Sequence, residues 1–172
     1  MASFTLRPWQ PGDAEDLTAA ANNPKIAANL RNTFPSPYTL ADAEWFVGDC
    51  IAKGEDYQLT RAIIIEGKAA GSIGVFIKDD VYGKSAELGY WLAESWWGKG
   101  VMTAAVRQIC REAFGHFDII RIFAEPFDCN LGSQRVLEKA GFTYEGTMRN
   151  GVCKNGRVLS YRVYSLLLEE LT

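Results

Sequence analysis

The sequence has little of the material from which metal centres and disulfide frameworks are made. Its 172 residues include one histidine, His116, and four cysteines with no C-x-x-C pair among them. Metal ligation needs clustered histidine, cysteine or carboxylate side chains, so we expect no metal in this protein. The spacing favours buried or idle thiols in a reducing cytoplasm, and the four cysteines are Cys50, Cys110, Cys129 and Cys153.

Long apolar runs and an excess of positive charge are also missing. No stretch reaches the length of a bilayer span, the N-terminus has no signal-peptide core, and the formal net charge is −3. We therefore expect neither a membrane nor a nucleic acid as a partner. A hydrophobic content of 48% and a charged content of 23% are typical of a soluble globular protein, here expected to be cytoplasmic. The length fits one domain, residues 1–172, and a local positive spot still permits a small anionic ligand.

Strand and helix patterns follow one another along the chain and predict a mixed α/β domain. Asp13 and Thr39 are placed to cap the helices that follow them. Helices are predicted over 14–22, from Pro24, over 40–51, 101–114 and 130–141. Strands are predicted from residue 3 to Pro8, twice within 57–78 around a turn at 66–69, and over 85–92, 119–127, 142–149 and 157–171. Residues 150–156 are predicted to be the turn between the last two strands.

Glycines stand where the fourth long helix should begin, in "ESWWGKGVMTAA", residues 94–105. A strand, a glycine-rich turn and a helix together make an anion site, because the first helical N–H groups lack partners and the dipole adds positive charge. Gly98 and Gly100 would let phosphate oxygens reach the main chain. Two nucleotide-loop patterns fail, since Lys99 is followed by glycine and Thr103 stands where a third glycine belongs. A tight turn without a ligand remains the alternative.

A second motif, "NLGSQRVLEKAGF", covers residues 130–142 and predicts a capped helix that ends at Gly141. Asn130, Ser133 and Leu137 share one face at helical spacing. Taken alone, Asn130 is most simply a helix cap and Ser133 a neutral helix residue.

Together, "GYWLAESWWGKGVMTAA" and "NLGSQRVLEKAGF" resemble the GNAT superfamily of acetyl-CoA-dependent N-acetyltransferases, in its RimJ/RimL-like branch. "FPSPYTLADAEWF", "GSIGV", "AELGYWL" and "EGTMRNGVCKNG…YSLL" extend the similarity over nearly the whole chain in the same order. The resemblance implies a GNAT-like α/β (mixed α+β) fold. This fold has a central, mostly antiparallel seven-stranded sheet with helices on both faces, splayed in the middle to hold acetyl-CoA as co-substrate.

The resemblance also implies where acetyl-CoA binds. The superfamily pattern [QR]-x-x-G-x-[GA] places Trp97, Gly100 and Met102 at its defined positions, and two of the three depart from it. Phosphate contact through main-chain N–H groups makes these departures tolerable. The pantetheine arm should pair with Trp91, Leu92 and Ala93, and the Asn130 amide should hold it. The pyrophosphate contacts are expected at Trp97, Gly98, Lys99, Gly100, Val101, Met102 and Thr103.

Acetyl transfer to an amine requires a neutral nucleophile, a stabilised oxyanion and a protonated leaving thiol. Glu87 shares a strand face with Gly89 and Trp91, and the resemblance makes it the expected base. Its alternative is an edge-strand charge facing solvent. A main-chain N–H around Tyr90 or Trp91 should serve the oxyanion. Many relatives carry a tyrosine at the position of Leu137, whereas this branch uses a serine, here Ser133, at the leaving thiol.

The acceptor is less well defined. Arg31, Phe34, Tyr38 and Tyr90 are expected to contact it, although packing is the favoured alternative for Phe34 and Tyr38. Ser160 stands where relatives often have an acid. An α-amine with a pKa near 8 needs about 1 kcal/mol to deprotonate at pH 7, against about 4.5 kcal/mol for lysine. The resemblance makes the α-amine of a protein or peptide N-terminus, of the ribosomal-protein type, the favoured acceptor. The alternatives are a small amine (a polyamine or an amine antibiotic) and a non-catalytic acyl-CoA-binding module. The oligomeric state is open, with a dimer possible.

Overall fold

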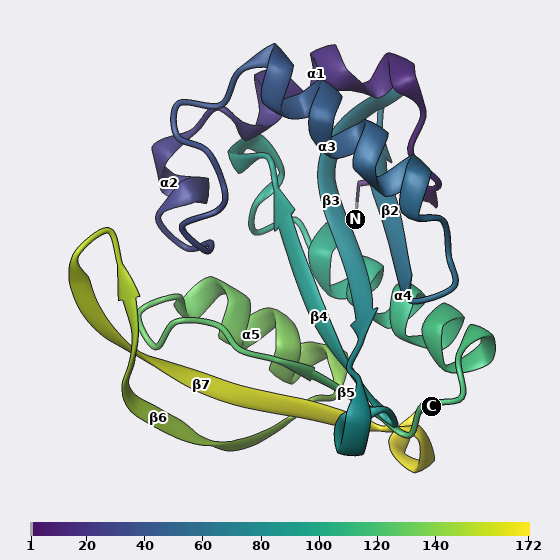
Figure 1. Cartoon of the computed structure of the whole chain (residues 1–172), viewed down its shortest axis with the longest axis vertical. Coiled ribbons are helices and arrows are strands. Elements are labelled where there is room, and N and C mark those ends of the chain that lie inside the picture. Colours follow the sequence, from purple (N-terminus) through teal and green to yellow (C-terminus); the bar gives the residue numbers. More distant parts are fainter. Residues whose placement is uncertain (1) are drawn as a thin grey trace.

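Seven strands form one sheet in the computed structural model, which describes residues 2–172 (Figure 1). Their order is β1-β2-β3-β4-β5-β7-β6, and only the β4–β5 pair is parallel. This is the mostly antiparallel seven-stranded sheet that the sequence predicts. The strands are β1 (Thr5–Arg7), β2 (Gln58–Ile65), β3 (Lys68–Ile77), β4 (Ser85–Leu92), β5 (Arg121–Ala124), β6 (Thr143–Lys154) and β7 (Arg157–Leu167).

Helices cover both faces of the sheet, as expected. Helices α1 and α3 pack on one face through a core that includes Leu17, Val47 and Ala62. Helix α4 packs on the other face through a larger core, and α5 lies against α4. The helices are α1 (Ala14–Ala21), α2 (Pro24–Ala27), α3 (Leu40–Lys53), α4 (Val101–His116) and α5 (Leu131–Ala140), with short 3-10 turns at Pro11–Asp13, Asp80–Tyr82, Glu94–Trp96 and Leu168–Glu170.

The two predicted helix caps have different outcomes. Thr39 caps α3, since its hydroxyl accepts from the Asp42 N–H at 3.3 Å and the Asp42 carboxylate accepts from the Thr39 N–H at 2.8 Å. The prediction for Asp13 is wrong, because its side chain caps nothing in α1. The Asp13 carboxylate instead accepts two hydrogen bonds from Arg7, at 2.7 and 2.8 Å. Two charge-assisted hydrogen bonds to the Arg7 guanidinium are stronger than one hydrogen bond to a neutral main-chain N–H of α1.

The sheet opens in its middle. Parallel pairing joins β4 to β5 only from Ser85–Arg121 to Glu87–Phe123. Beyond that point β4 continues along β3 to Leu92, whereas the chain after β5 continues along β7, with its isolated bridge at Phe127 and Tyr161. The two halves of the sheet therefore separate after Glu87, which is the splay that the fold class implies.

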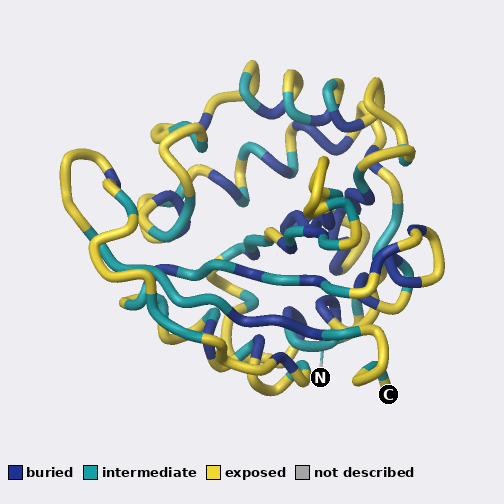
Figure 2. Tube along the Cα trace, turned by 60° about the horizontal axis from the view of Figure 1, so that its bottom comes forward, coloured by how far each residue is buried: buried dark blue, intermediate teal, exposed yellow. Residues whose placement is uncertain are grey.

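The predicted turn over residues 150–156 is too long. Strand β6 runs on to Lys154, and only Asn155 and Gly156 lie between β6 and β7. The pairing with β7 is irregular between Met148 and Val152, where Asn150 adopts a positive φ of 52°. An extra-residue bulge bends a strand without ending it. The resulting hairpin is long, and most of its residues near the tip are exposed (Figure 2).

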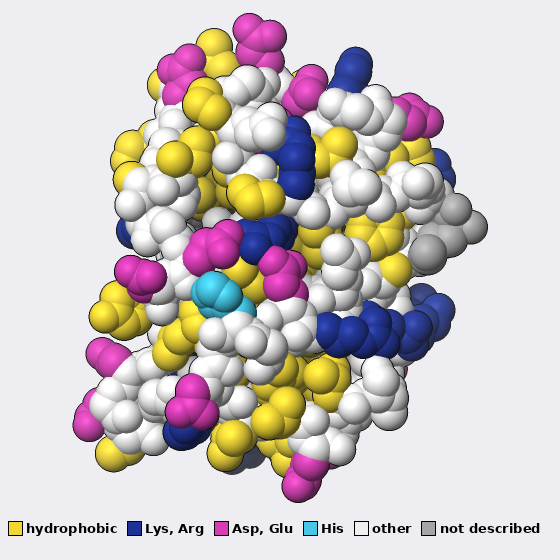
Figure 3. All heavy atoms as spheres, turned by 90° about the vertical axis from the view of Figure 1, so that its right-hand side faces the viewer, with side chains coloured by type: hydrophobic (Ala, Val, Ile, Leu, Met, Phe, Trp, Pro, Cys, Tyr) yellow, Lys and Arg dark blue, Asp and Glu magenta, His cyan; other side chains and the backbone are white. Residues whose placement is uncertain are grey.

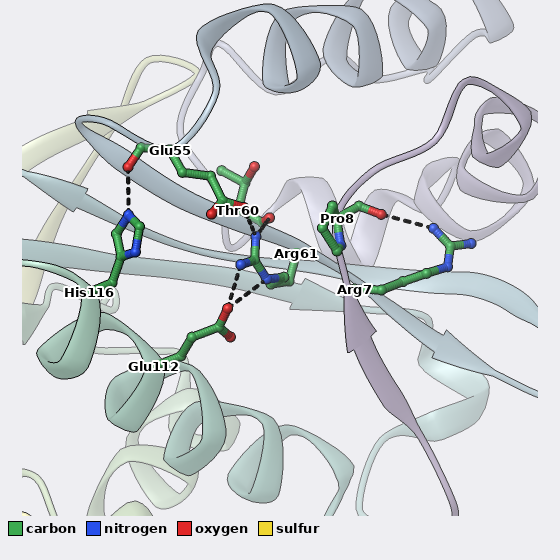
Figure 4. A network of polar contacts seen from close by, with 7 residues as sticks. All are labelled: Arg7, Pro8, Glu55, Thr60, Arg61, Glu112 and His116. Atoms are coloured by element: carbon green, nitrogen blue, oxygen red, sulfur yellow. Dashed lines mark hydrogen bonds and ion pairs between the residues drawn. The ribbon is translucent and has the colours of Figure 1, made fainter.

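A charged network joins β2 to α4 (Figure 4). The buried guanidinium of Arg61 pairs with the carboxylates of Glu55 and Glu112. His116 Nε2 lies 2.9 Å from the Glu55 main-chain oxygen. Acidic and basic side chains mingle on this face (Figure 3). The two carboxylates compensate the charge of the buried guanidinium, which fits a structural role for this cluster.

Candidate active site

The glycine turn of residues 98–100 has the conformation that only glycine adopts cheaply. Gly98 and Gly100 have φ values of 71° and 78°, and Gly100 is the residue before α4, with no side-chain cap on the helix. Within residues 2–172, no main-chain N–H from 98 to 103 donates a hydrogen bond; the first to do so is Ala104, to Gly100 O at 3.2 Å. Six adjacent donors without partners at a helix N-terminus fit a diphosphate.

The side chains around this turn hold it in place. Trp97 donates from Nε1 to the Leu92 carbonyl at 2.7 Å, and Lys99 lies over the Trp96 ring with Nζ 4.5 Å from its centroid. Val101 and Met102 point into the core, with 0% and 8% exposure. The departures from the family pattern at Trp97 and Met102 therefore leave the main-chain amides open.

Beyond Glu87, β4 presents one row of main-chain groups to the separated half of the sheet. Ala93 N–H donates to Ala70 O at 2.8 Å, on the β3 side. Because the two sides alternate along a strand, the groups of Tyr90 and Leu92 face the splay. The Leu92 carbonyl already accepts a hydrogen bond from the Trp97 side chain. The Leu92 N–H and the main-chain N–H and C=O of Tyr90 therefore remain for a ligand that pairs like an added strand.

Ser133 lies on the α5 side of the splay, in contact with a side chain that the sequence did not assign to it. Its Oγ is 2.7 Å from the Tyr90 hydroxyl, and its N–H donates to Asn130 Oδ1 at 3.2 Å. Asn130 therefore caps α5, as its simplest interpretation predicted. Burial raises the pKa of the Tyr90 hydroxyl, so it stays protonated at neutral pH. Leu137 is fully buried.

Glu87 lies on the opposite face of β4 and is not free. Its carboxylate pairs with the Arg31 guanidinium and lies 3.9 Å from Lys78 Nζ. The Glu87 side chain is 19% exposed, whereas that of Arg31 is 69% exposed. A second carboxylate, Glu125, follows β5 nearby; its pKa is raised by burial and by the charge of Glu87, and lowered less by Arg31 and Lys78.

Aromatic side chains line the sheet face next to Glu87. The Phe34 ring is 6.0 Å from Trp91 and 5.1 Å from Tyr38, centroid to centroid. Phe34 and Trp91 are half-buried, but Tyr38 is only 5% exposed, and burial raises its pKa to about 12. Tyr38 thus packs in the core beneath Phe34, and the expected acceptor contact at Tyr38 remains a prediction.

The α2–α3 segment and the β6–β7 hairpin meet across this face (Figure 1). Asn32 Nδ2 donates to Cys153 O at 3.1 Å, and Asn155 N–H donates to Asn32 Oδ1 at 3.2 Å. The buried Lys154 donates to Arg31 O at 3.3 Å. We call these contacts the clasp. Further along the hairpin, Ser160 Oγ accepts from the Asn150 N–H at 3.0 Å and so supports the bulge.

The structure brings together most of the side chains that the sequence names, and it adds two groups that the sequence did not name, the Glu125 carboxylate and the Tyr90 hydroxyl. Glu125 was hidden because it follows a strand and belongs to no motif. No local pattern indicated the contact of the Tyr90 hydroxyl, because its partner Ser133 is 43 positions away in the sequence. A period-two argument on "SAELGYWL" would have placed Tyr90 on the face opposite Glu87.

Four other features, namely metal clusters, membrane-spanning helices, cysteines and surface hollows, add nothing to this candidate site. No cluster of three or more metal-ligating side chains exists within residues 2–172. No helix in that range is long and apolar enough to cross a bilayer. Cys50 and Cys110 are buried, Cys129 and Cys153 are exposed, and all four are free thiols. A hollow of about 530 Å³ beside β1, the β2–β3 turn and Trp96 contains none of the predicted site residues.

Comparison with known proteins identifies the family. A family model described as an acetyltransferase (GNAT) domain matches residues 3–143. The chain is 35% identical over 170 residues to the putative ribosomal N-acetyltransferase YdaF of Bacillus subtilis (strain 168), covering 97% of this chain and 92% of the relative. The fold and these matches define an acyl-transferring enzyme of mixed α/β architecture. The chain belongs to the GNAT acetyltransferase family and is an acetyl-CoA-dependent N-acetyltransferase.

Solved structures agree with this fold. Mycobacterium smegmatis RimJ in complex with CoA-disulfide matches with a TM-score of 0.88 at 22% identity, over 99% of this chain and 84% of that chain. Spermidine N-acetyltransferase from Vibrio cholerae in complex with CoA and spermine matches with a TM-score of 0.79 at 20% identity, over 98% and 97%. Because the family is enzymatic, the alternative of a non-catalytic binding module is not retained.

Proposed function

We propose that this N-acetyltransferase acetylates the α-amine of a protein or peptide N-terminus by direct transfer. The observation that carries the proposal is the placement of Glu87 and Ser133 on opposite sides of the point where β4 and β5 separate. A base on one side and a hydroxyl on the other suit an amine and a thioester that meet in the splay. The relative YdaF, named a putative ribosomal N-acetyltransferase, supports the same class of acceptor.

The donor is held by the main chain. The open N–H groups of residues 98–103 bind the diphosphate, and the Leu92 N–H and the main-chain groups of Tyr90 pair with the pantetheine arm, with Asn130 beside it. The main-chain groups of Trp91 and Ala93, which the sequence also assigned to this pairing, face β3 instead. Acetyl-CoA supplies the thioester, whose C–S bond breaks as the new C–N bond forms. The main-chain N–H of Tyr90 or Leu92 faces the splay and stabilises the charge that develops on the carbonyl oxygen.

Side chains carry out the proton transfers of the reaction. Glu87 takes a proton from the incoming ammonium, directly or through water, so that the neutral amine can attack. We assign Tyr90 as the donor in its 2.7 Å contact with Ser133 Oγ, because this direction leaves the Ser133 hydroxyl proton free to hydrogen-bond the departing thiolate. The thiolate then gains its proton through Ser133 or from water. No step requires a covalent enzyme intermediate.

The contacts of the clasp favour an acceptor with a narrow cross-section. Contacts between Asn32 and the hairpin bridge the face on which Glu87 lies. An extended chain end fits under such a bridge more readily than a lysine on the surface of a folded protein. A small polyamine also fits, and the carboxylates of Glu87 and Glu125 favour it as the second candidate.

A thiol-release assay with a panel of acceptors tests the proposal. The panel comprises short peptides with free and blocked N-termini, a peptide with only a lysine amine, spermidine and an aminoglycoside. We expect release of free CoA with free N-termini, and mass spectrometry should locate the acetyl group on the α-amine. Turnover confined to spermidine would transfer the assignment to the small-amine class, and turnover confined to lysine would overturn it.

A further inference from the structure

Glu125 is a second carboxylate at the opening of the sheet. The main-chain pairing of β5 with β7 joins Phe123 to Ser165 and Ala124 to Tyr164, and Arg162 N–H donates to Pro126 O at 2.9 Å. The extended register thus continues past the end of β5. Side chains two positions apart on an extended chain share a face, so Glu125 lies on the face of Phe123, the register partner of Glu87.

The Glu125 carboxylate is half-buried and makes no hydrogen bond or ion pair with residues 2–172. The charges that act on it are those of Glu87, Arg31 and Lys78. Burial and Glu87 raise its pKa more than the two cations lower it. A partly buried carboxylate without a partner, beside another carboxylate, is a poor structural element and a good receiver for a cation.

Arg31 is the cation that now lies closest to this pair. Its side chain is 69% exposed, and its only ion-pair partner within residues 2–172 is Glu87. Its main-chain oxygen accepts a hydrogen bond from Lys154. An ion pair this exposed typically changes an equilibrium constant by less than about fivefold. The guanidinium can therefore leave while the backbone of the segment stays in place.

We propose that Glu125 and Glu87 together form the ammonium subsite for the acceptor, and that the Arg31 side chain occupies this subsite until the acceptor displaces it. This inference rests on the proposed function and specifies its substrate class. The acceptor enters as a primary ammonium ion on an extended chain, with no carboxylate next to the amine. Glu125 binds and orients the acceptor, while Glu87 remains the proton acceptor.

Two substitutions have opposite expected effects on the acceptor KM. Glu125→Gln keeps the shape but removes the charge, and should raise the KM for a tetra-alanine amide and for spermidine about tenfold, with kcat within about threefold. Arg31→Met keeps most of the length but removes the competing charge, and should lower that KM by up to about fivefold. Methylguanidinium added to Arg31→Met should restore the wild-type KM by competing with the acceptor. Glu44→Gln, an exposed glutamate on α3, is the matched control.

The outcomes distinguish a failure of the proposed subsite from a failure of the proposed function. An unchanged acceptor KM in Glu125→Gln, or a raised one in Arg31→Met, overturns the subsite even if N-terminal acetylation is found. If no amine is turned over, the proposed function fails, and calorimetric titration of the CoA-loaded protein with spermidine decides the subsite. Binding that weakens about tenfold in Glu125→Gln supports it, and equal or absent binding overturns it. Should Glu125→Gln unfold, Arg31→Met gives the test alone, since its side chain is exposed.

Discussion

Replacing Tyr90 with phenylalanine isolates one hydroxyl at the proposed leaving-group side. The Tyr90 hydroxyl lies 2.7 Å from Ser133 Oγ and 3.4 Å from the Ser133 carbonyl, so the first contact is the hydrogen bond that matters. Phenylalanine fills the same space between β4 and α5, which keeps the packing. The substitution therefore removes the orientation of Ser133 and little else.

The magnitude follows from the kind of bond that is lost. A neutral hydroxyl pair contributes about 0.5–1.5 kcal/mol net. If the bond acts in the transition state, this energy corresponds to a fall in kcat of about twofold to tenfold. Ser133→Ala removes the hydroxyl that contacts the thiolate and should lower kcat about tenfold to a thousandfold, with little change in the acetyl-CoA affinity.

A double-mutant cycle on kcat, measured by thiol release at saturating acetyl-CoA, provides the assay. In the Ser133→Ala background Tyr90→Phe should have no further effect, because the bond no longer exists. Tyr144→Phe is the matched control, since its hydroxyl lies 2.7 Å from Thr147 Oγ1 on the exposed hairpin and its loss should leave kcat unchanged. An equal fall in kcat from Tyr90→Phe with and without Ser133 would refute the reasoning, because Tyr90 would then act independently.

Three further predictions concern the base, the glycine turn and the hairpin. Glu87→Gln should move the acidic limb of the pH–rate profile upward, because the amine must lose its proton unaided, and an unchanged limb would remove Glu87 as the base. Gly100→Ala should weaken acetyl-CoA binding, measured by calorimetry, about tenfold, since φ is 78° there and a Cβ in this region costs about 1–2 kcal/mol; unchanged affinity would contradict a role for the turn. Arg121 holds the pKa of Glu145 at about 2, so their pair stabilises the fold above the ordinary glutamate pKa near 4.5 and loses this effect as the pH falls toward 2. Glu145→Gln should therefore lower the melting temperature at pH 7 and not near pH 2, and an equal difference at both would exclude this linkage.

The sheet and helices were predictable because each is specified by nearby residues. Sequence patterns predicted all seven strands, and Val101, Ala105 and Ile109, which recur at helical spacing, form part of the buried face of α4. In α3 the apolar pattern is a less exact guide to burial, because Leu40 and Ile51 are 43% and 47% exposed, whereas Cys50 is buried. A periodic pattern defines a helix more securely than the edge of its buried face, because the neighbouring layer decides which marginal positions are covered.

The proposed donor side could be predicted from the sequence in the same way, because it consists of main-chain groups. Glycines at positive φ and a helix N-terminus are local properties of residues 98–103, and their chemistry does not depend on distant partners. The hydrogen bond between Tyr90 and Ser133, by contrast, depends on a long-range contact between β4 and α5. Their meeting follows only when α5 is laid against β4, which no local pattern specifies.

The acceptor side depends on more distant contacts still. Four segments converge there: the α2–α3 segment with Arg31, the end of β3 with Lys78, β4 with Glu87, and the residue after β5, Glu125. Three of these side chains come from loops or strand ends, whose positions depend on the clasp and on where β4 and β5 separate. In the proposed subsite, acceptor selectivity depends on charges brought together by tertiary contacts alone, so we expect relatives with the same donor motif to differ in acceptor. Substitutions at Arg31 and Glu125 should therefore change which amine is used before they change how acetyl-CoA is held.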